Sequence, residues 1–400
     1  MTAPRTMTAP ADRLWNARYI KVMAANFSMF FAFYLLTPLL PMYMTQEFGA
    51  TKDVIGIILA GYSATALLVR PFSGYLVDTF PRKRVLMVCF WAFVLLFGGY
   101  ILAGTMLWFA LVRVLHGGPF GALTVVNTTV AIDVLPASRR NEGLALYGVG
   151  NNLAMAIAPT LAITLYHYAD SFQLLFWLAT FVAAIGLALD QSLRLPQREC
   201  APPPKSLSLD RFFLIPGWAL GLNLVLNGFC IGVYNYYLAI YSHEVRGITS
   251  GAGIFFSLMA IGLITSRIVG RRSMRMGLLS QSAVRGLLIS SVGFTLFIAV
   301  PATWSYYAAA LTVGIGNGMM WPAFQNMMLS LGTHMQRGTA NSTTFTSWDT
   351  GIGLGILLGG VISEHAGYTA TFWTVAAAQI AATLMFILFT RGYFERRRLR

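Results

Sequence analysis

Three ionisable residues lie inside segments that otherwise carry almost no charge. Asp349 lies in an uncharged stretch that runs from about Gly338 to Ser363, and Arg113 and His116 lie three residues apart in another apolar stretch. A carboxylate placed between an apolar environment and a nearby cation can bind and release a proton, because these two surroundings favour opposite charge states. The three residues therefore predict a proton-coupling site.

The composition indicates whether water or lipid surrounds the segments that carry these residues. Apolar residues make up 56% of the 400 residues and charged residues only 10%, whereas soluble chains carry roughly 25% charged residues. Mostly uncharged runs of about 20 residues, long enough to cross a bilayer, recur along the whole chain. The predicted spans are 19–44, 54–78, 85–104, 107–131, 143–166, 172–192, 214–241, 250–267, 279–300, 304–330, 339–362 and 370–390. We therefore predict an all-α integral membrane protein with twelve transmembrane helices.

The net charge of +14 follows the predicted topology. With a cytoplasmic N-terminus, 24 Lys and Arg residues fall in cytoplasmic segments, whereas only Lys52 and Arg246 fall in outside loops. This asymmetry predicts that both termini are cytoplasmic, in what we expect to be a bacterial inner membrane. Anionic lipid headgroups suffice as partners for the basic tail, so no nucleic acid is expected.

The chain divides into two halves of six predicted helices each. Residues 1–193 form the first half, the Pro-containing cytoplasmic linker spans 194–213, and residues 214–400 form the second. Weak internal similarity indicates duplication: LLVRPFSG at the end of helix two is similar to LITSRIVG at the end of helix eight.

The loop after helix two, GYLVDTFPRKRVL, resembles the hallmark Gly-x-Leu-Ala-Asp-Arg-x-Gly-Arg-Lys of the major facilitator superfamily. The matching residues are Gly74, Leu76, Asp78, Arg82 and Lys83. Val77 stands in place of Ala, Thr79 in place of Arg and Pro81 in place of the second Gly, whose absence affects the expected turn geometry. The resemblance implies a major facilitator fold and a gating latch at the cytoplasmic mouth that stabilises the outward-facing state. We expect the latch to consist of Gly74, Asp78, Arg82 and Lys83.

A second resemblance lies in helix four, where RVLHGGPFGA is similar to the family pattern Arg-x-x-Gln-Gly-x-Gly, with His116 in the Gln position. In the related efflux proteins this arginine, here Arg113, is tied to proton coupling. Asp349 is expected about 15 Å deep, near the midplane, where a charged group needs a partner. Arg113 and Arg70 are the candidate counter-charges for Asp349, and the sequence does not decide between them.

The resemblance also implies a central cavity lined mainly by helices one, four, seven and ten. Amides and aromatic rings on these and neighbouring helices should point inward, because lipid does not satisfy polar groups. We expect about half of them to bond helix to helix and the others to bind substrate. The candidates are Asn26, Phe30, Phe33, Tyr34, Asn151, Asn223, Asn227, Tyr234, Asn235, Trp321, Gln325 and Trp348.

These features predict a secondary transporter that exports small amphipathic organic molecules by proton antiport with alternating access. AMAIAPTLA, residues 154–162, resembles a degraded antiporter signature and favours export slightly. The alternatives are a proton symporter that imports a sugar or organic acid, and a receptor-like membrane protein that binds a ligand without moving it. We expect a monomer and no enzyme, since HExxH and GxSxG are absent. No cofactor or metal is expected either, since the three cysteines show no CxxC spacing.

Overall fold

The computed structural model describes residues 14–399 apart from 38, 51, 196–211 and 249–250. Within this part of the chain the regular structure is helical and contains no strand. The predicted linker 194–213 falls almost wholly outside the described residues.

The described helices fall into two sets, one in each half of the chain. Those of the first half are α1 (Ala17–Leu36), α2 (Leu40–Phe48), α3 (Lys52–Thr79), α4 (Arg82–Ile101), α5 (Met106–Val134), η2 (Ala137–Arg139), α6 (Arg140–Ala169) and α7 (Phe172–Gln191). Those of the second half are η4 (Ile215–Gly217), α8 (Trp218–Glu244), α9 (Gly251–Val269), α10 (Arg271–Arg275), α11 (Leu279–Ala299), α12 (Thr303–Leu331), η5 (His334–Gln336), α13 (Arg337–Met385), η6 (Phe386–Thr390) and α14 (Arg391–Arg397).

The prediction of twelve transmembrane helices is confirmed. Eleven helices in the described chain have 19 or more residues, and α13 comprises two helices joined at Gly367, whose φ of 81° interrupts the helix. The predicted first span, 19–44, is broken into α1 and α2, because Pro41 occupies the first turn of α2 and has no N–H to continue a helix. Nine described segments are by length and hydropathy alone apolar enough to cross a membrane.

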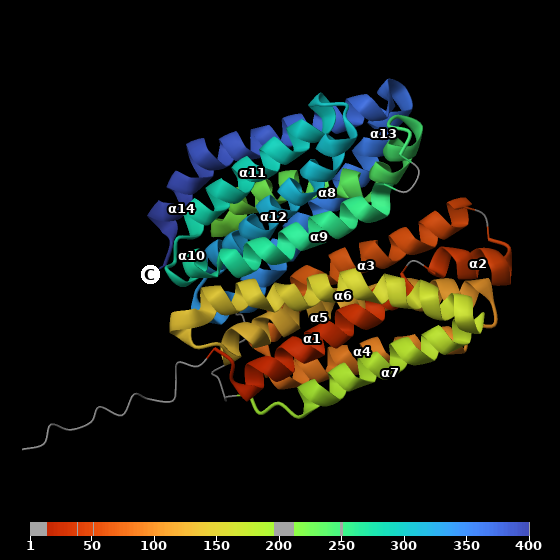
Figure 1. The fold of residues 1–400 in the computed structure, drawn as a ribbon. Coiled ribbons are helices and arrows are strands. Elements are labelled where there is room, and N and C mark those ends of the chain that lie inside the picture. Colours follow the sequence, from red (N-terminus) through yellow and green to blue (C-terminus); the bar gives the residue numbers. More distant parts are fainter. Residues whose placement is uncertain (1–13, 38, 51, 196–211, 249–250, 400) are drawn as a thin grey trace, which may run out of the picture.

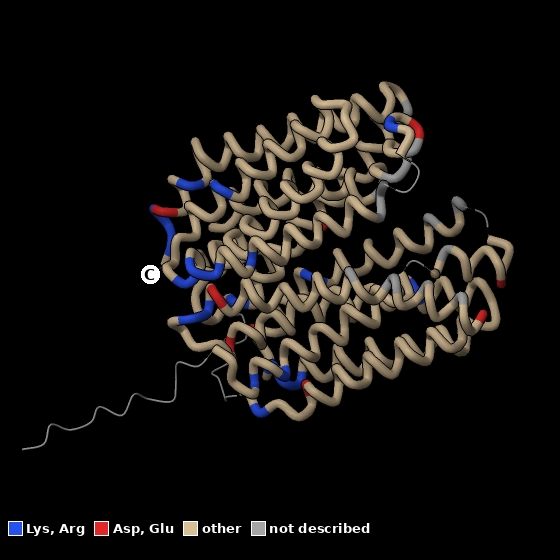
Figure 2. The backbone as a smooth tube through the Cα atoms, viewed as in Figure 1, with Lys and Arg blue, Asp and Glu red and all other residues tan. Residues whose placement is uncertain are grey.

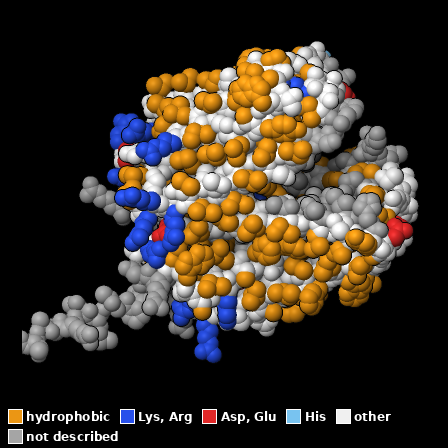
Figure 3. Space-filling model, viewed as in Figure 1, with side chains coloured by type: hydrophobic (Ala, Val, Ile, Leu, Met, Phe, Trp, Pro, Cys, Tyr) orange, Lys and Arg blue, Asp and Glu red, His pale blue; other side chains and the backbone are white. Residues whose placement is uncertain are grey.

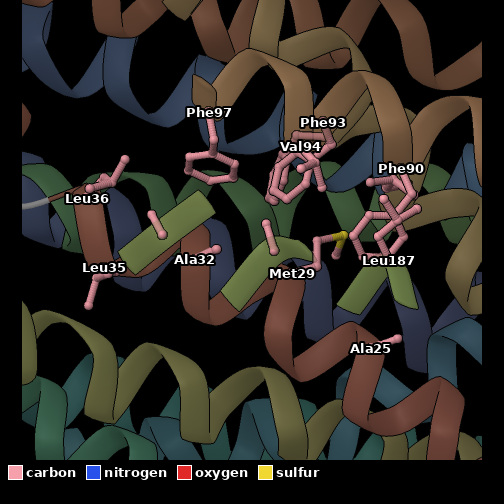
Figure 4. Close-up of a cluster of buried hydrophobic side chains, with 14 of the residues drawn as sticks. Ala25, Met29, Ala32, Leu35, Leu36, Phe90, Phe93, Val94, Phe97 and Leu187 are labelled. Carbon is pink, nitrogen blue, oxygen red and sulfur yellow. The ribbon is translucent and has the colours of Figure 1, made fainter. Parts of the chain in front are cut away.

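Each half buries its own apolar core. In Figure 1 helices α1 to α7 form one bundle and α8 to α14 the other. Aromatic residues of α4 dominate part of the first core, where Phe90 and Phe93 lie near Met29 of α1 (Figure 4). The outer surface carries a broad band of exposed apolar side chains (Figure 3), as a protein surrounded by lipid requires.

Lys and Arg residues gather at one end of both bundles, which we call the basic end (Figure 2). Helix α1 begins there and α14 ends there (Figure 1). The basic end also includes the connections from α3 to α4, from α5 to α6 and from α9 to α11.

The two halves are structural repeats in which α4, α5 and α6 begin 197 residues before α11, α12 and α13. Helix α5 and helix α12 both have 29 residues and begin 197 residues apart. Their glycines make the same contacts: a Cβ on Gly121 would lie 2.6 Å from the carbonyl oxygen of Ala66, and one on Gly318 would lie 2.6 Å from that of Leu263. Both pairs of residues are related by the same offset. The weak similarity in sequence therefore corresponds to equivalent helix crossings.

We predict that Gly121→Ala and Gly318→Ala destabilise the protein to similar extents. Each added methyl group would force two helix backbones apart, and overpacking of this kind typically costs about 1–3 kcal/mol. The apparent unfolding midpoint in detergent should fall in both variants. Gly98→Ala is the control, because nothing lies within 4 Å of a Cβ at that position. Equal midpoints for all three variants would show that these crossings are not tightly packed.

Candidate functional site

An ion pair joins the two halves in the interior of the molecule. The Arg70 guanidinium on α3 pairs with the Asp349 carboxylate on α13. Asp349 lies twelve residues after the start of α13, or about 18 Å along the helix, and Arg70 lies nine residues, or about 14 Å, before the end of α3. Both charges are therefore far from the basic end.

The two members of the ion pair differ in solvent exposure. The Arg70 side chain is 6% exposed, whereas that of Asp349 is 28% exposed. Nη1 of Arg70 donates a hydrogen bond of 3.4 Å to the carbonyl oxygen of Phe345, and Cζ lies 5.3 Å from the centre of the Phe345 ring. The arginine is therefore fixed by protein, while water can reach the carboxylate.

Arg113 does not pair with Asp349. Its Cζ lies 3.9 Å from the ring centre of Tyr62, and its Nη1 lies 3.5 Å from the hydroxyl of Tyr100. That hydroxyl also lies 3.0 Å from Nδ1 of His116. Arg113 and His116 thus share one tyrosine inside the first half. Of the two candidate counter-charges for Asp349, the structure selects Arg70.

In the predicted latch, Asp78 accepts hydrogen bonds from the N-terminus of α13. The Asp78 carboxylate accepts hydrogen bonds of 2.9 Å from the backbone N–H groups of Gly338 and Thr339, which belong to the first turn of that helix. A carboxylate at a helix N-terminus is stabilised by the free N–H groups and by the helix dipole. Asp78 therefore ties the first half to the second at the basic end.

The two cations of the predicted latch differ in their partners. Arg82 pairs with Asp78, at 3.5 Å, and with Asp133 of α5. Asp133 also pairs with Arg337 of the second half at 2.6 Å. Lys83 instead donates to carbonyl oxygens at the end of α7, among them that of Leu193 at 3.0 Å. Arg82 therefore takes part in a contact between the halves, whereas the Lys83 contacts lie within the first half.

Close helix packing accompanies these charges. A Cβ on Gly74 would lie 2.6 Å from Cβ of Ser342 and 2.8 Å from the carbonyl oxygen of Gly338. On the opposite side of the interface, Glu142 of α6 pairs with Arg271 of α10. The halves thus meet on both sides of the basic end, while Figure 3 shows a notch between them at the other end of the molecule.

Predicted cavity residues form two aromatic clusters, one in each half. Trp321 and Trp348 have ring centroids 4.8 Å apart, and Trp321 lies 5.7 Å from Phe345, the ring that contacts Arg70. In the first half, Phe33 stacks on Phe120 with ring centroids 4.5 Å apart. Phe30 and Tyr34, whose ring centroids are 6.1 Å apart, belong to this second group.

Other predicted cavity residues serve helix packing. Asn223 donates a hydrogen bond of 2.8 Å to the Thr390 hydroxyl, and Tyr234 is buried within 5.1 Å of Phe294, Phe297 and Phe372. Both residues therefore lie in the interior of the second half. The amide of Asn227 donates to the carbonyl oxygen of Asn223 on its own helix.

The other predicted positions differ in exposure. Asn26 and Gln325 are buried, Asn151 is half-buried, and Asn235 is exposed.

Sequence analysis missed the carboxylates that complete the contacts at the basic end. Asp133 and Glu142 lie at the predicted helix ends, beside runs of arginine, and each pairs with an arginine of the other half. An acid within a basic loop is the signal that could have identified them, because the positive-inside pattern alone does not require acids there.

Comparison with known proteins agrees with this architecture. The family model of the Major Facilitator Superfamily matches residues 22–331 and 264–400. The chain belongs to this superfamily. It is 22% identical to the staphylopine export protein of Staphylococcus aureus over 342 residues, which are 81% of this chain and 84% of the relative. It is 25% identical to the maltose permease of Geobacillus stearothermophilus over 378 residues, or 91% and 93% of the two chains.

The fold also matches a solved structure. The human organic anion transporter MFSD10 superposes with a TM-score of 0.80 at 19% identity, covering 92% of this chain and 99% of that one. Members of the superfamily are transporters of small molecules, so this chain is an integral membrane transport protein.

We predict that Asp78→Asn separates the halves at the basic end. The amide has one acceptor oxygen in place of two and no charge, and a charge-assisted hydrogen bond typically contributes about 1.5–3 kcal/mol, equivalent to a ten- to hundredfold change in the closed fraction. Spin labels at Arg84→Cys and Arg272→Cys, both exposed and on different halves, report the separation by double electron–electron resonance, with the native cysteines replaced. The distances between the two spin labels should be longer in Asp78→Asn than in the protein with Asp78.

The control for this variant is Asp170→Asn, an exposed residue at the end of α6. It should leave the distance distribution unchanged. An unchanged distribution in Asp78→Asn would mean that the latch does not hold the basic end closed.

Proposed function

We propose that this protein is a secondary active exporter of small amphipathic organic molecules, driven by proton antiport. The observation that carries the proposal is the Arg70–Asp349 pair, a titratable carboxylate whose partner belongs to the other half. The basic end faces the cytoplasm of a bacterial inner membrane, with both termini on that side, in accordance with the positive-inside rule. The closed basic end then makes this an outward-facing conformation.

Proton binding to Asp349 is the coupling step. A proton that enters from the outside reaches the partly exposed carboxylate and removes its charge. The Coulombic attraction to Arg70 is then lost, and the closed basic end loses one of its stabilising contacts. Low external pH therefore favours opening to the cytoplasm, where the proton is released and the pair can form again. The equilibrium responds to protonation because the carboxylate is paired in only one of the two states.

Substrate would bind next to this pair. Trp321, Trp348 and Phe345 form an aromatic surface in the second half, and Phe30, Phe33 and Phe120 form one in the first. Aromatic faces bind planar and weakly cationic organic molecules by stacking and cation–π contacts. Asn151, half-buried with no hydrogen-bond partner for Oδ1 in the described chain, would add a polar contact.

The direction of transport is supported by similarity. The staphylopine export protein is an exporter by name and aligns along most of both chains. Arg113 and His116 occupy the helix-four positions that the resemblance to efflux proteins ties to proton coupling, and we keep them in that role as a second group near Tyr100.

The alternative is a proton symporter that imports a sugar or organic acid. The similarity to the maltose permease favours it, because this relative aligns over more residues than the exporter does. Proton binding at Asp349 opens the basic end in either mechanism. The two mechanisms differ in whether the substrate moves with the proton or against it.

Efflux from cells lacking their own pumps tests this proposal. A panel of lipophilic cationic dyes should leave wild-type cells in a protonophore-sensitive manner. Asp349→Asn should abolish this efflux while the protein remains folded and present in the membrane, because the amide does not carry a proton at neutral pH. We expect at least a tenfold loss of rate, equivalent to about 1.4 kcal/mol.

Asp190→Asn is the matched control, since Asp190 is a buried carboxylate on α7 in the core of the first half. This variant should retain protonophore-sensitive efflux. Protonophore-sensitive efflux in Asp349→Asn would remove that residue from the coupling role. Proton-driven uptake of a sugar or organic acid into proteoliposomes, with no dye efflux, would establish the symporter in place of the exporter.

A further inference from the structure

The chain that leads into η4 is fixed to the second half at Leu214. The Leu214 side chain is fully buried, and its backbone N–H donates a hydrogen bond of 2.8 Å to the hydroxyl of Thr343 on α13. Its carbonyl oxygen accepts a hydrogen bond of 2.8 Å from the N–H of Gly217, the last residue of η4. A buried side chain and two hydrogen bonds therefore hold this residue on the second half.

Phe212, two residues earlier, contacts the first half instead. Its ring centroid lies 5.4 Å from that of Phe72 and 5.4 Å from that of Tyr75, both on α3. Phe72 and Tyr75 are three residues apart in one helix and so share a face of it. Tilted and edge-to-face rings at such distances attract each other beyond the effect of the area that they bury. We call this contact between three rings the aromatic clasp.

The residue between these two anchors, Phe213, lies against the second half. Its Cζ atom is 3.6 Å from the position of a Cβ added at Gly221 of α8. Phe212 and Phe213 are both half-buried. Two neighbouring phenylalanines of similar exposure thus contact opposite halves of the protein.

The aromatic clasp cannot follow a separation of the two halves. Two residues of extended chain span at most about 7 Å. Because Leu214 is held on α13 and Phe212 contacts α3, a larger separation of these helices must detach one of the two residues. Detaching Leu214 would expose a fully buried side chain, whereas Phe212 would leave a surface at which Phe72 is already 56% exposed. The ring contacts are therefore the ones that break.

We propose that the aromatic clasp holds the basic end closed, with Phe212 as a positioning residue for this conformation. The clasp forms when α3 and α13 meet and is lost when they separate, so it favours the closed state without contacting Asp349. It adds an aromatic contact to the hydrogen bonds of Asp78 with the start of α13. The inference goes beyond the proposed function, because it requires only that the halves separate at the basic end, whatever the substrate and the direction of transport.

The experiment measures the ratio of open to closed basic ends by double electron–electron resonance in the full-length protein. The spin labels are again at Arg84→Cys and Arg272→Cys, and each variant is measured both with Asp78 and with Asp78→Asn. Phe212→Ala should raise the ratio about two- to tenfold, as expected for the loss of an aromatic pair. Phe213→Ala is the matched control and should leave the ratio unchanged, because its ring packs within one half.

Two further variants test whether the ring contact is the cause. Phe212→Trp keeps an aromatic ring and should keep the wild-type ratio. Tyr75→Ala should raise the ratio, and adding it to Phe212→Ala should raise the ratio no further, since residues in contact do not act additively.

An unchanged ratio in Phe212→Ala, in both backgrounds, would overturn the proposal. Equal shifts in Phe212→Ala and Phe213→Ala would overturn it as well, because they would indicate a general loosening of this segment. Absence of dye efflux from wild-type cells would contradict the proposed export and would leave this measurement unaffected.

Discussion

A charge in the interior of a membrane protein requires a partner, and the Arg70–Asp349 pair meets this requirement across the interface between the two halves. The guanidinium is on α3 and the carboxylate on α13, so the pair forms across the interface that is closed at the basic end. Contacts nearer the basic end depend on the same approach of α3 to α13. Gly74 packs against the first turns of α13, and Asp78 accepts hydrogen bonds from that helix start. Loss of charge at Asp349 therefore removes one of several contacts that hold α3 against α13.

The duplicated halves are alike in backbone and unlike in charge. Equivalent glycines permit equivalent crossings in both halves, and Arg70 and Arg267 are equivalent arginines. The residue opposite each arginine differs, because α13 supplies Asp349 and α6 supplies Asn152. On our proposal the carboxylate makes the first interface sensitive to protons, whereas the equivalent interface carries a neutral amide.

Features that depend on one segment could be predicted from sequence. The helical spans follow largely from hydropathy, Asp349 stands out because a carboxylate is rare inside an apolar span, and Asp78 was identified by its place in the family motif. Features that depend on how two helices are rotated toward each other could not be predicted from sequence. Arg113 and Arg70 were both possible partners of Asp349 until the structure placed Arg113 over the Tyr62 ring. Likewise Tyr234 has the composition of a cavity residue, but its helix turns it into the core of the second half.

The most direct test of the central claim is a double-mutant cycle on the Arg70–Asp349 pair. Arg70→Gln, Asp349→Asn and the double variant would each carry the spin labels on α4 and α10, and the closed fraction would be measured by double electron–electron resonance. If the pair holds the halves together, each single variant opens the basic end and the double variant opens it little further, with a coupling energy of about 0.5–3 kcal/mol. Additive effects, or no change in the closed fraction, would contradict the account.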